Sequence, residues 1–307
     1  MAWDFSLEAV TIKAMQRIRT RTICSVISVV LLIFSRLSAA ENLPESALPH
    51  DHNLEHALRS AVESLGLAAT LQEKHLAVSL VDVTDPAKPH YAGLNDRHMM
   101  YAASLPKIAV LVAGFERIHA GLMDYTPEVK EMFIRMTRFS SNPDASRAIH
   151  QIGFQYIADV LTSKYHFYDP AENGGLWVGK AYGGPQDYWR RDPLHHISHG
   201  ATTFEVSRLF VLLEQRRLVT PEYSDQMKEI LSRPAIHHKF VKGLDRLPGH
   251  IVYRKSGTWS IWHSDAALVE HGGKKYIAVA LMEDSHGGQI LPELIVKLDR
   301  LICGEHQ

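Results

Sequence analysis

Strand-forming segments lie near the two ends of this chain, and helix-forming segments fill the stretch between them. Strands are stable only when they pair, so these distant segments are expected to meet. The simplest arrangement is an α/β (α+β) fold, in which an antiparallel sheet built from both chain ends is flanked by N- and C-terminal helices and carries an inserted all-helical lobe. The expected strands are residues 76–83, a strand beginning at Tyr91, residues 251–262, and a hairpin of 266–269 with 276–282 about Gly272-Gly273.

Apolar residues recur at helical spacing in several other segments. Thr126 and Pro127 predict an N-cap and a first helical residue ahead of an apolar stripe. Residues 165–200 lack such a period and are rich in Gly, Pro, Tyr and Trp, and loops of this length are usually functional. The aromatic residues of this stretch are expected to pack the loop rather than to bind sugar, and they are Trp177, Tyr182, Tyr188 and Trp189. The other expected helices are 54–65 with Asn53 as N-cap, one opened at Ser104 and running through 108–118, 206–213 behind a capping box of Thr202 and Glu205, and 291–301.

The first 40 residues follow the order of a signal peptide. Three arginines between residues 17 and 21 precede a short apolar run at 23–34, and small residues then lead up to Ala40. We expect cleavage after Ala40 and export to the periplasm or the medium; Met15 is a candidate true start. An uncleaved anchor is the alternative, but the apolar run is shorter than a membrane-spanning helix needs, so no stable span is expected after cleavage.

Residues 41–52 are expected to be a lead-in, and residues 53–307 a catalytic domain. Cleavage would remove Cys24 and leave Cys303 alone, which excludes an internal disulfide. The formal net charge is -1, so nothing marks a nucleic-acid binder, and we expect a monomer. Within the domain, the expected α/β lobe covers 53–102 and 235–307, and the expected helical lobe covers 103–234.

Three short motifs carry candidate chemistry. The first is Ser104-Leu105-Pro106-Lys107, in which a lysine at i+3 is expected on the same helical face as a serine and can act as its base. The second, Ser140-Ser141-Asn142, is also what an ordinary helix stop before Pro143 would look like. In the third, Lys255-Ser256-Gly257-Thr258, the glycine within a strand indicates either close approach of a ligand or backbone, or a bulge.

The order of these motifs, S-x-x-K, then S-x-N, then K-S-G-T, resembles the class A β-lactamases and their penicillin-binding relatives. The resemblance spans about Asn53 to Ile302. It implies that Ser104 attacks the carbonyl of a β-lactam or cell-wall peptide and is acylated. It further implies that Lys107 takes the serine proton, with a pKa lowered by a second cation such as Lys255. No cofactor is implied.

The resemblance also implies roles for the remaining motif residues. Ser140 would pass a proton to the leaving nitrogen, and Asn142 would hold Lys107 and the substrate amide. The backbone N–H groups of Ser104 and Thr258 would form the oxyanion hole. Within the third motif, the substrate carboxylate would be bound by Lys255 and by the hydroxyls of Ser256 and Thr258, beside Gly257.

The sequence departs from the class A pattern in three ways. Ser141 stands where the family usually has Asp, and the interval between the first two motifs is short. No E-x-x-L-N context for a deacylating glutamate occurs between residues 165 and 200, where Glu172 does not match that context well and Asp169 and Asp187 are other carboxylates. The acyl-enzyme is therefore expected to hydrolyse slowly, unless a histidine of this loop replaces the glutamate.

His195 and His199 have the i, i+4 spacing of helical metal ligands, but Pro193 and Gly200 argue against a helix there, so no metal is predicted. The pair His237-His238 is expected to be surface or structural. The predicted function is a β-lactamase-like serine hydrolase that acts on cyclic amides and confers antibiotic resistance. Two alternatives stay open. One is a peptidoglycan peptidase or esterase, and the other is a penicillin-binding sensor that is acylated without turnover.

Overall fold

The computed structural model describes residues 48–171, 173–184 and 188–304. The predicted signal peptide and cleavage site, together with Cys24, Glu172 and Asp187, lie outside the described residues. Within those residues, no helix has both the length and the apolar character that crossing a membrane requires.

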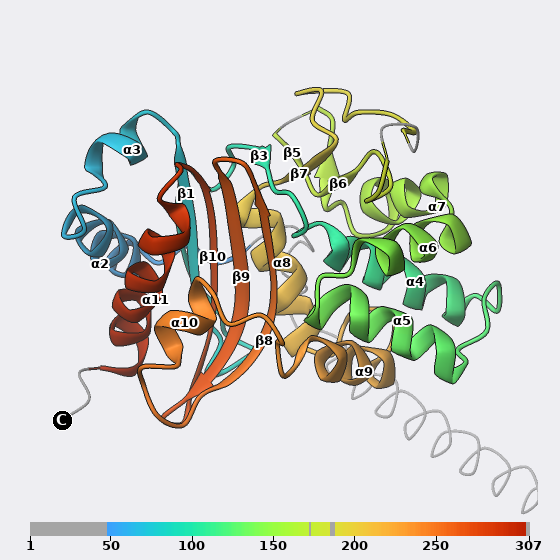
Figure 1. Cartoon of the computed structure of the whole chain (residues 1–307). Coiled ribbons are helices and arrows are strands. Elements are labelled where there is room, and N and C mark those ends of the chain that lie inside the picture. The colour runs from blue at the N-terminus through green and yellow to red at the C-terminus, as the bar shows by residue number, and fades with distance from the viewer. Residues whose placement is uncertain (1–47, 172, 185–187, 305–307) are drawn as a thin grey trace, which may run out of the picture. The chain divides into compact units, whose positions relative to one another are not determined.

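One five-stranded antiparallel sheet joins the two ends of the chain, as predicted (Figure 1). The strands lie in the order β2-β1-β10-β9-β8, so the pairing of β1 with β10 connects the N-terminal and C-terminal parts. Strand β8 is at the edge that faces the helical region. The strands are β1 (Leu76–Asp82), β2 (His90–Leu94), β8 (Ile251–Trp259), β9 (Trp262–His271) and β10 (Lys274–Glu283).

The prediction of a single strand over 251–262 is wrong. Trp259 pairs with Trp262, and the two residues between them form the turn of a β8–β9 hairpin. Ser260 takes a positive φ of 52° there, although the turn holds none of the glycine, proline or asparagine residues that usually mark one. The hairpin predicted about Gly272-Gly273 is confirmed as β9–β10.

Four helices cover one face of the sheet and enclose an apolar core (Figure 1). The predicted N-cap Asn53 is wrong, because the Asp51 carboxylate accepts the N–H groups of Asn53 and Leu54, both at 3.0 Å. A carboxylate there also suits the positive end of the helix dipole. These helices are α2 (His52–Glu63), α3 (Ala68–Gln72), α10 (Phe240–Leu244) and α11 (Gly287–Cys303).

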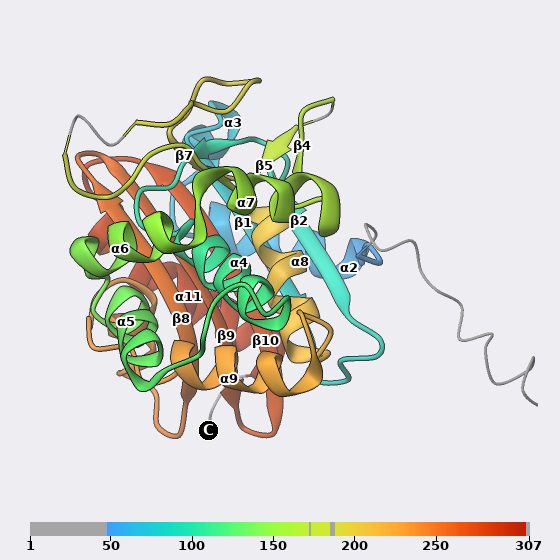
Figure 2. The ribbon, with the colours of Figure 1, turned by 90° about the vertical axis from the view of Figure 1, so that its right-hand side faces the viewer.

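A second core lies between the other sheet face and the inserted helices (Figure 2). Two predicted caps are confirmed: the Thr126 hydroxyl accepts the Val129 N–H, and the Thr202 hydroxyl accepts the Glu205 N–H. The inserted helices are α4 (Lys107–His119), α5 (Pro127–Arg138), α6 (Asn142–Ile152), α7 (Phe154–Asp159) with a π-helical turn at Val160–Lys164, α8 (Thr203–Glu214) and α9 (Pro221–Leu231).

In the described residues of the long stretch predicted as irregular, the regular elements are short strands, and one of them pairs with the segment that precedes Ser104. Strand β7 pairs with β3, and the Ala102 N–H donates to the His199 carbonyl at 2.8 Å. Trp177 stacks on Trp189, so these aromatic residues pack the loop, as expected. The short strands are β3 (Met100–Tyr101), β4 (Tyr168–Asp169), β5 (Gly174–Gly175), β6 (Trp177–Val178) and β7 (His199–Ala201).

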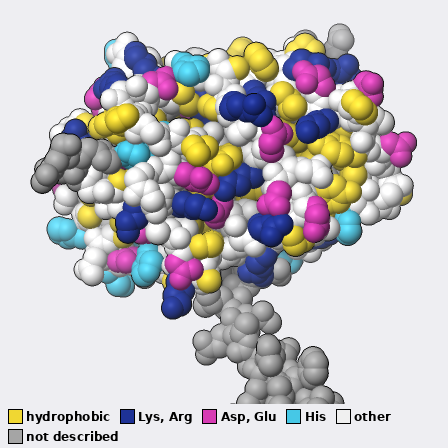
Figure 3. Space-filling view, turned by 90° about the horizontal axis from the view of Figure 1, so that it is seen from below, with side chains coloured by type: hydrophobic (Ala, Val, Ile, Leu, Met, Phe, Trp, Pro, Cys, Tyr) yellow, Lys and Arg dark blue, Asp and Glu magenta, His cyan; other side chains and the backbone are white. Residues whose placement is uncertain are grey.

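The surface seen in Figure 3 carries basic and acidic side chains interspersed with one another. Lys228, for example, forms ion pairs with both Glu214 and Glu270. On this face there is therefore no broad basic field of the kind that binds a polyanion, which agrees with the net charge of -1.

Candidate active site

Ser104 lies in a tight turn between β3 and α4, and it is half-buried. The expectation that Ser104 opens the helix is corrected, because α4 begins only at Lys107, after Pro106. Ala103, with a φ of 50°, turns the chain sharply, and the Lys107 N–H donates to the Ser104 carbonyl at 3.3 Å. A turn closed by this backbone hydrogen bond, rather than a shared helical face, therefore links Ser104 to Lys107.

Gly257 packs directly against the Ser104 backbone. A Cβ atom at position 257 would lie 2.5 Å from the Ser104 nitrogen and would also clash with the Ala102 carbonyl. Ser264, which pairs with Gly257 across the hairpin, donates its hydroxyl to that same Ala102 carbonyl at 2.7 Å. The structure therefore brings the first and third motifs together, and it explains the glycine by close approach of backbone rather than by a bulge.

Two buried lysines meet at the hydroxyl of Ser140. Lys107 Nζ donates to the Ser140 carbonyl at 2.6 Å and to Asn142 Oδ1 at 2.7 Å, and it lies 3.5 Å from Ser140 Oγ. Lys255 Nζ donates to Ser140 Oγ at 2.8 Å and to the Ser256 carbonyl at 2.6 Å. The second motif thus joins the other two, and its hydroxyl connects both ammonium groups.

Burial changes the acid–base chemistry of both lysines. It lowers the pKa of Lys107 to about 7, so an appreciable fraction is a neutral amine near neutral pH. Burial also lowers the pKa of Lys255 well below its usual range, with a further contribution from the nearby Lys107 ammonium. The sequence led us to expect that Lys255 lowers the pKa of Lys107. In the structure, the pKa of Lys107 is lowered by its burial instead.

The Ser140–Asn142 motif connects two helices. Ser140 has a φ of 55°, and Ser141 is the N-cap of α6. The Ser141 hydroxyl accepts the Asp144 N–H at 3.3 Å and donates to Asp144 Oδ2 at 2.6 Å. Where the resemblance leads one to expect an aspartate, this chain therefore has a serine that begins the next helix. The role of Ser141 is therefore local, as the N-cap of α6.

The backbone of β8 presents an N–H group to the site. Trp259 and Trp262 flank a two-residue turn, so in the alternating antiparallel pattern Gly257 exchanges hydrogen bonds with Ser264, and Thr258 points away from β9. Because β8 is the edge strand, the Thr258 N–H points off the sheet. The predicted oxyanion donors, at Ser104 and Thr258, therefore lie on two segments in direct contact through Gly257.

The groups predicted to bind a substrate carboxylate differ in their surroundings. Thr258 is exposed, Lys255 is buried, and the Ser256 hydroxyl lies 3.1 Å from His238 Nε2. The adjacent pair His237-His238 gave no functional signal in the sequence, where it was expected to be surface or structural. His237 is indeed exposed and paired with Asp245. His238, however, contacts a predicted site residue.

Two further residues were missed. Lys239 is buried, and its ammonium donates to the carbonyl oxygens of Gly257 and, at 3.1 Å, Ser264. The Tyr182 ring lies 4.5 Å from Lys107 Nζ, and its hydroxyl donates to the Ala103 carbonyl at 3.2 Å. The sequence treated Tyr182 as loop packing, and no local pattern marks either residue, because each acts through a contact distant in sequence.

No carboxylate replaces the missing glutamate beside Lys107 among the described loop residues. The Asp169 carboxylate accepts the Ala171 N–H at 2.8 Å, and buried Asp192 accepts the Tyr168 hydroxyl and several loop N–H groups. His195 and His199 are not on a helix, and they belong to neither of the possible metal-binding groups found in the described chain. His199 Nε2 lies 3.0 Å from the Lys180 carbonyl, its Nδ1 is buried without a hydrogen-bond partner, and burial lowers its pKa to about 4.

The architecture of the described residues is a β-lactamase-like fold. The family model of the "Beta-lactamase enzyme family" matches residues 191–304. No curated protein matches the chain. The resemblance inferred from the three motifs is confirmed at the level of the fold by this match and by the following similar structures.

A β-lactamase from Sphaerobacter thermophilus has a TM-score of 0.64 at 15% identity, covering 79% of this chain and 96% of that one. A structure of PBP-A has a TM-score of 0.62 at 15% identity, with coverages of 83% and 98%. A class A β-lactamase from Bacteroides cellulosilyticus has a TM-score of 0.58 at 19% identity, with coverages of 80% and 98%. Together these likenesses show that the chain has a β-lactamase-like fold.

Proposed function

We propose that the chain is an exported serine hydrolase in which Ser104 attacks the carbonyl of a β-lactam and forms an acyl-enzyme. The observation that carries the proposal is the convergence on Ser140, where the ammonium groups of Lys107 and Lys255 lie within 3.5 and 2.8 Å of one hydroxyl. Two buried cations beside half-buried hydroxyls are costly unless they bind or transfer charge. They therefore favour a catalytic arrangement over a structural one.

In the proposed acylation, the neutral amine of Lys107 takes the proton of the Ser104 hydroxyl as the oxygen bonds to the carbonyl carbon. The developing oxyanion accepts hydrogen bonds from the N–H groups of Ser104 and Thr258. When the ring C–N bond breaks, Ser140 donates its proton to the nitrogen, and the Lys107 ammonium returns one to Ser140. The Lys107 hydrogen bonds to Ser140 and Asn142 are compatible with this, because catalytic contacts often form fully only with substrate bound.

Release of the acyl group is expected to be slow. Water must be activated to hydrolyse the ester, and a missing general base typically lowers such a rate by about 10²–10⁴. The group packed on Lys107 from the long loop is the aromatic ring of Tyr182, which is not a base at neutral pH. The absence of a class A glutamate also favours the second candidate, a peptidoglycan peptidase or esterase that uses the same residues.

Time-resolved intact mass of the protein with benzylpenicillin tests the proposal. We expect a covalent adduct of the full penicillin mass, with no adduct in the Ser104→Ala variant. Adduct that accumulates and then disappears over minutes to hours indicates slow turnover, and adduct that persists indicates the sensor alternative. Absence of any adduct with penicillins and cephalosporins, in protein shown to be folded, would contradict the proposed acylation.

The export proposal rests on the signal-peptide order of residues 1–40 and has its own test. N-terminal sequencing of protein recovered from the periplasm or medium should begin at Glu41. A full-length N-terminus, retained in the cytoplasmic fraction, would refute export without affecting the chemistry proposed at Ser104.

A further inference from the structure

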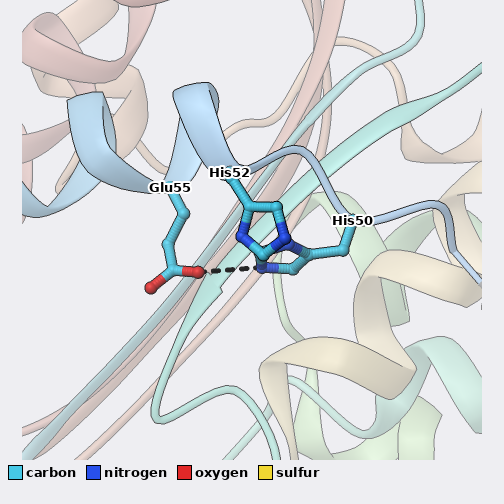
Figure 4. Close-up of side chains that lie close together, drawn as sticks. All are labelled: His50, His52 and Glu55. Carbon is cyan, nitrogen blue, oxygen red and sulfur yellow. Dashed lines mark ion pairs between the residues drawn. The ribbon is translucent and has the colours of Figure 1, made fainter.

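The described part of the chain contains two groups of histidines and carboxylates close enough to share a metal ion. The first, His50, His52 and Glu55, is at the start of α2 (Figure 4). His50 Nε2 already pairs with the Glu55 carboxylate at 2.9 Å, and both histidines are exposed. An exposed ion pair of this kind is common on protein surfaces and does not indicate a bound metal. In the experiments below, this group is therefore used only as a control.

The second group is buried between α11, the β9–β10 hairpin and the segment before β8. It consists of His250, His271 and Asp299, with side chains that are 5%, 6% and 0% exposed. Around Asp299 Oδ1, His271 Nδ1 lies at 3.0 Å and His250 Nε2 at 3.5 Å. The Tyr276 hydroxyl donates to the same oxygen at 2.9 Å and holds the carboxylate in place.

The hydrogen bonds of His250 indicate what the group is built to hold. Its Nδ1 lies 2.9 Å from the Leu247 carbonyl, which can only accept, so Nδ1 carries the proton. In the neutral ring Nε2 then carries no proton and has a lone pair. It makes no hydrogen bond, and it faces an oxygen of the Asp299 carboxylate. Two acceptors facing each other in a buried site repel, and a cation between them removes the repulsion.

Cys303 lies next to this group of three donors but is not part of it, and its thiol also donates to the His271 carbonyl at 3.7 Å. Its sulfur lies 3.7 Å from Asp299 Oδ1, one helical turn along α11. Bonds of 2.0–2.3 Å in a tetrahedral zinc site place neighbouring donor atoms roughly 3.3–3.8 Å apart. The separations of 3.0 and 3.5 Å from Asp299 Oδ1 to His271 Nδ1 and His250 Nε2 are close to that spacing, and a rotation of the Cys303 side chain would bring its sulfur toward the same point.

We propose that His250, His271 and Asp299 bind one zinc ion, and that the neighbouring Cys303 side chain turns toward the ion as its fourth ligand. The ion replaces the proton shared by His271 and Asp299, and the Cys303 thiol loses its proton to the solvent as the Zn–S bond forms. The Leu247 carbonyl and the Tyr276 hydroxyl orient the ligands from outside, as such groups do in zinc sites. The ion joins the end of α11 to the sheet, so its role is structural and independent of the chemistry proposed at Ser104.

The test uses the full chain carrying Cys24→Ser, so that Cys303 is the only thiol. Titration with Co²⁺ should saturate at about one equivalent and give a thiolate charge-transfer band in the near ultraviolet. Cys303→Ser should abolish the band, and His250→Gln should weaken binding by at least tenfold. The double variant His50→Gln/His52→Gln is the matched control, and it should bind like the parent.

Two further measurements keep the outcome clear if a variant folds poorly. In the Cys24→Ser parent itself, Zn²⁺ should slow alkylation of Cys303 by iodoacetamide and raise the melting midpoint. The proposal is overturned if the folded parent shows neither a thiolate band nor protection of Cys303. It is equally overturned if metal binding is lost in the His50/His52 variant and kept in Cys303→Ser, which assigns the metal to the exposed histidines.

Discussion

The buried ammonium of Lys239 donates a hydrogen bond to the carbonyl oxygen of Gly257, whose peptide unit ends in the N–H of Thr258. The second bond of Lys239, to the Ser264 carbonyl at 3.1 Å, holds it across the β8–β9 pair. Charge on the oxygen side of a peptide polarises the whole unit and makes its N–H a stronger donor. The one residue thus both positions and polarises a proposed oxyanion donor.

Replacing Lys239 by Met should therefore slow acylation of Ser104 by about tenfold, less than the 10²–10³ typical of removing a direct donor. Lys239→Arg should recover part of the rate because it restores the positive charge. Lys242→Met, an exposed site on the same helix, is the matched control and should acylate normally. Rates are read from adduct formation by rapid-quench mass spectrometry. An unchanged rate in folded Lys239→Met would show that the ammonium has only a packing role.

The rate of acylation should depend on pH through Lys107. Only the neutral amine can take the serine proton, and a pKa of about 7 means that this form grows as pH rises from 6 to 8. We expect the rate to rise about tenfold per unit below pH 7 and to level off above it, whereas an ordinary lysine would place the rise near pH 10. Lys107→Arg, which stays charged, should not acylate. A rise centred near pH 10 would contradict the assignment of Lys107 as base.

Gly257→Ala should damage both stability and acylation. The added methyl group would clash with backbone atoms of the Ser104 turn, including the Ser104 nitrogen at 2.5 Å. Backbone atoms cannot move aside as easily as the end of a flexible side chain can. We expect a loss of about 1–3 kcal/mol in the free energy of unfolding and an acylation rate lower by on the order of 10².

Gly288→Ala provides the comparison for Gly257→Ala. A methyl group at position 288 reaches only ordinary contact, 3.6 Å from the His263 ring, and it lies within α11. Denaturant unfolding should show no loss of stability for this variant. Equal behaviour of the two variants would remove the argument for close backbone approach at position 257.

The two described aspartates of the long loop should behave differently from a catalytic base. Asp192→Asn should lower the free energy of unfolding by roughly 2 kcal/mol, because the new amide group opposes N–H donors that now meet a carboxylate. Asp169→Asn should change neither stability nor the lifetime of the acyl-enzyme. Adduct decay followed by intact mass checks this, and a markedly longer lifetime in Asp169→Asn would identify it as the deacylation base.

Local signals in the sequence predicted most of the framework. Thr126 and Thr202 were recognised as caps, and Gly272-Gly273 as a hairpin turn, because each rests on hydrogen bonds between near neighbours in the chain. The β8–β9 turn was missed because the alternating pattern runs through Ser260 without a residue that favours a positive φ. The first residue of α4 was missed because the Ser104 turn is held by Gly257 and Ser264, which local patterns do not include.

Sequence alone determined that strands from both chain ends enclose a helical insertion, and that three motifs in order resemble a penicillin-recognising hydrolase. Only the tertiary structure decided that Ser140 lies between Lys107 and Lys255, 115 residues from the latter, and that Tyr182 covers Lys107 and Lys239 supports Gly257. The physical reason is the separation along the chain over which each kind of interaction acts. Caps, turns and periodicity act over a few residues, whereas desolvation and hydrogen bonding at the site depend on which distant segments pack together.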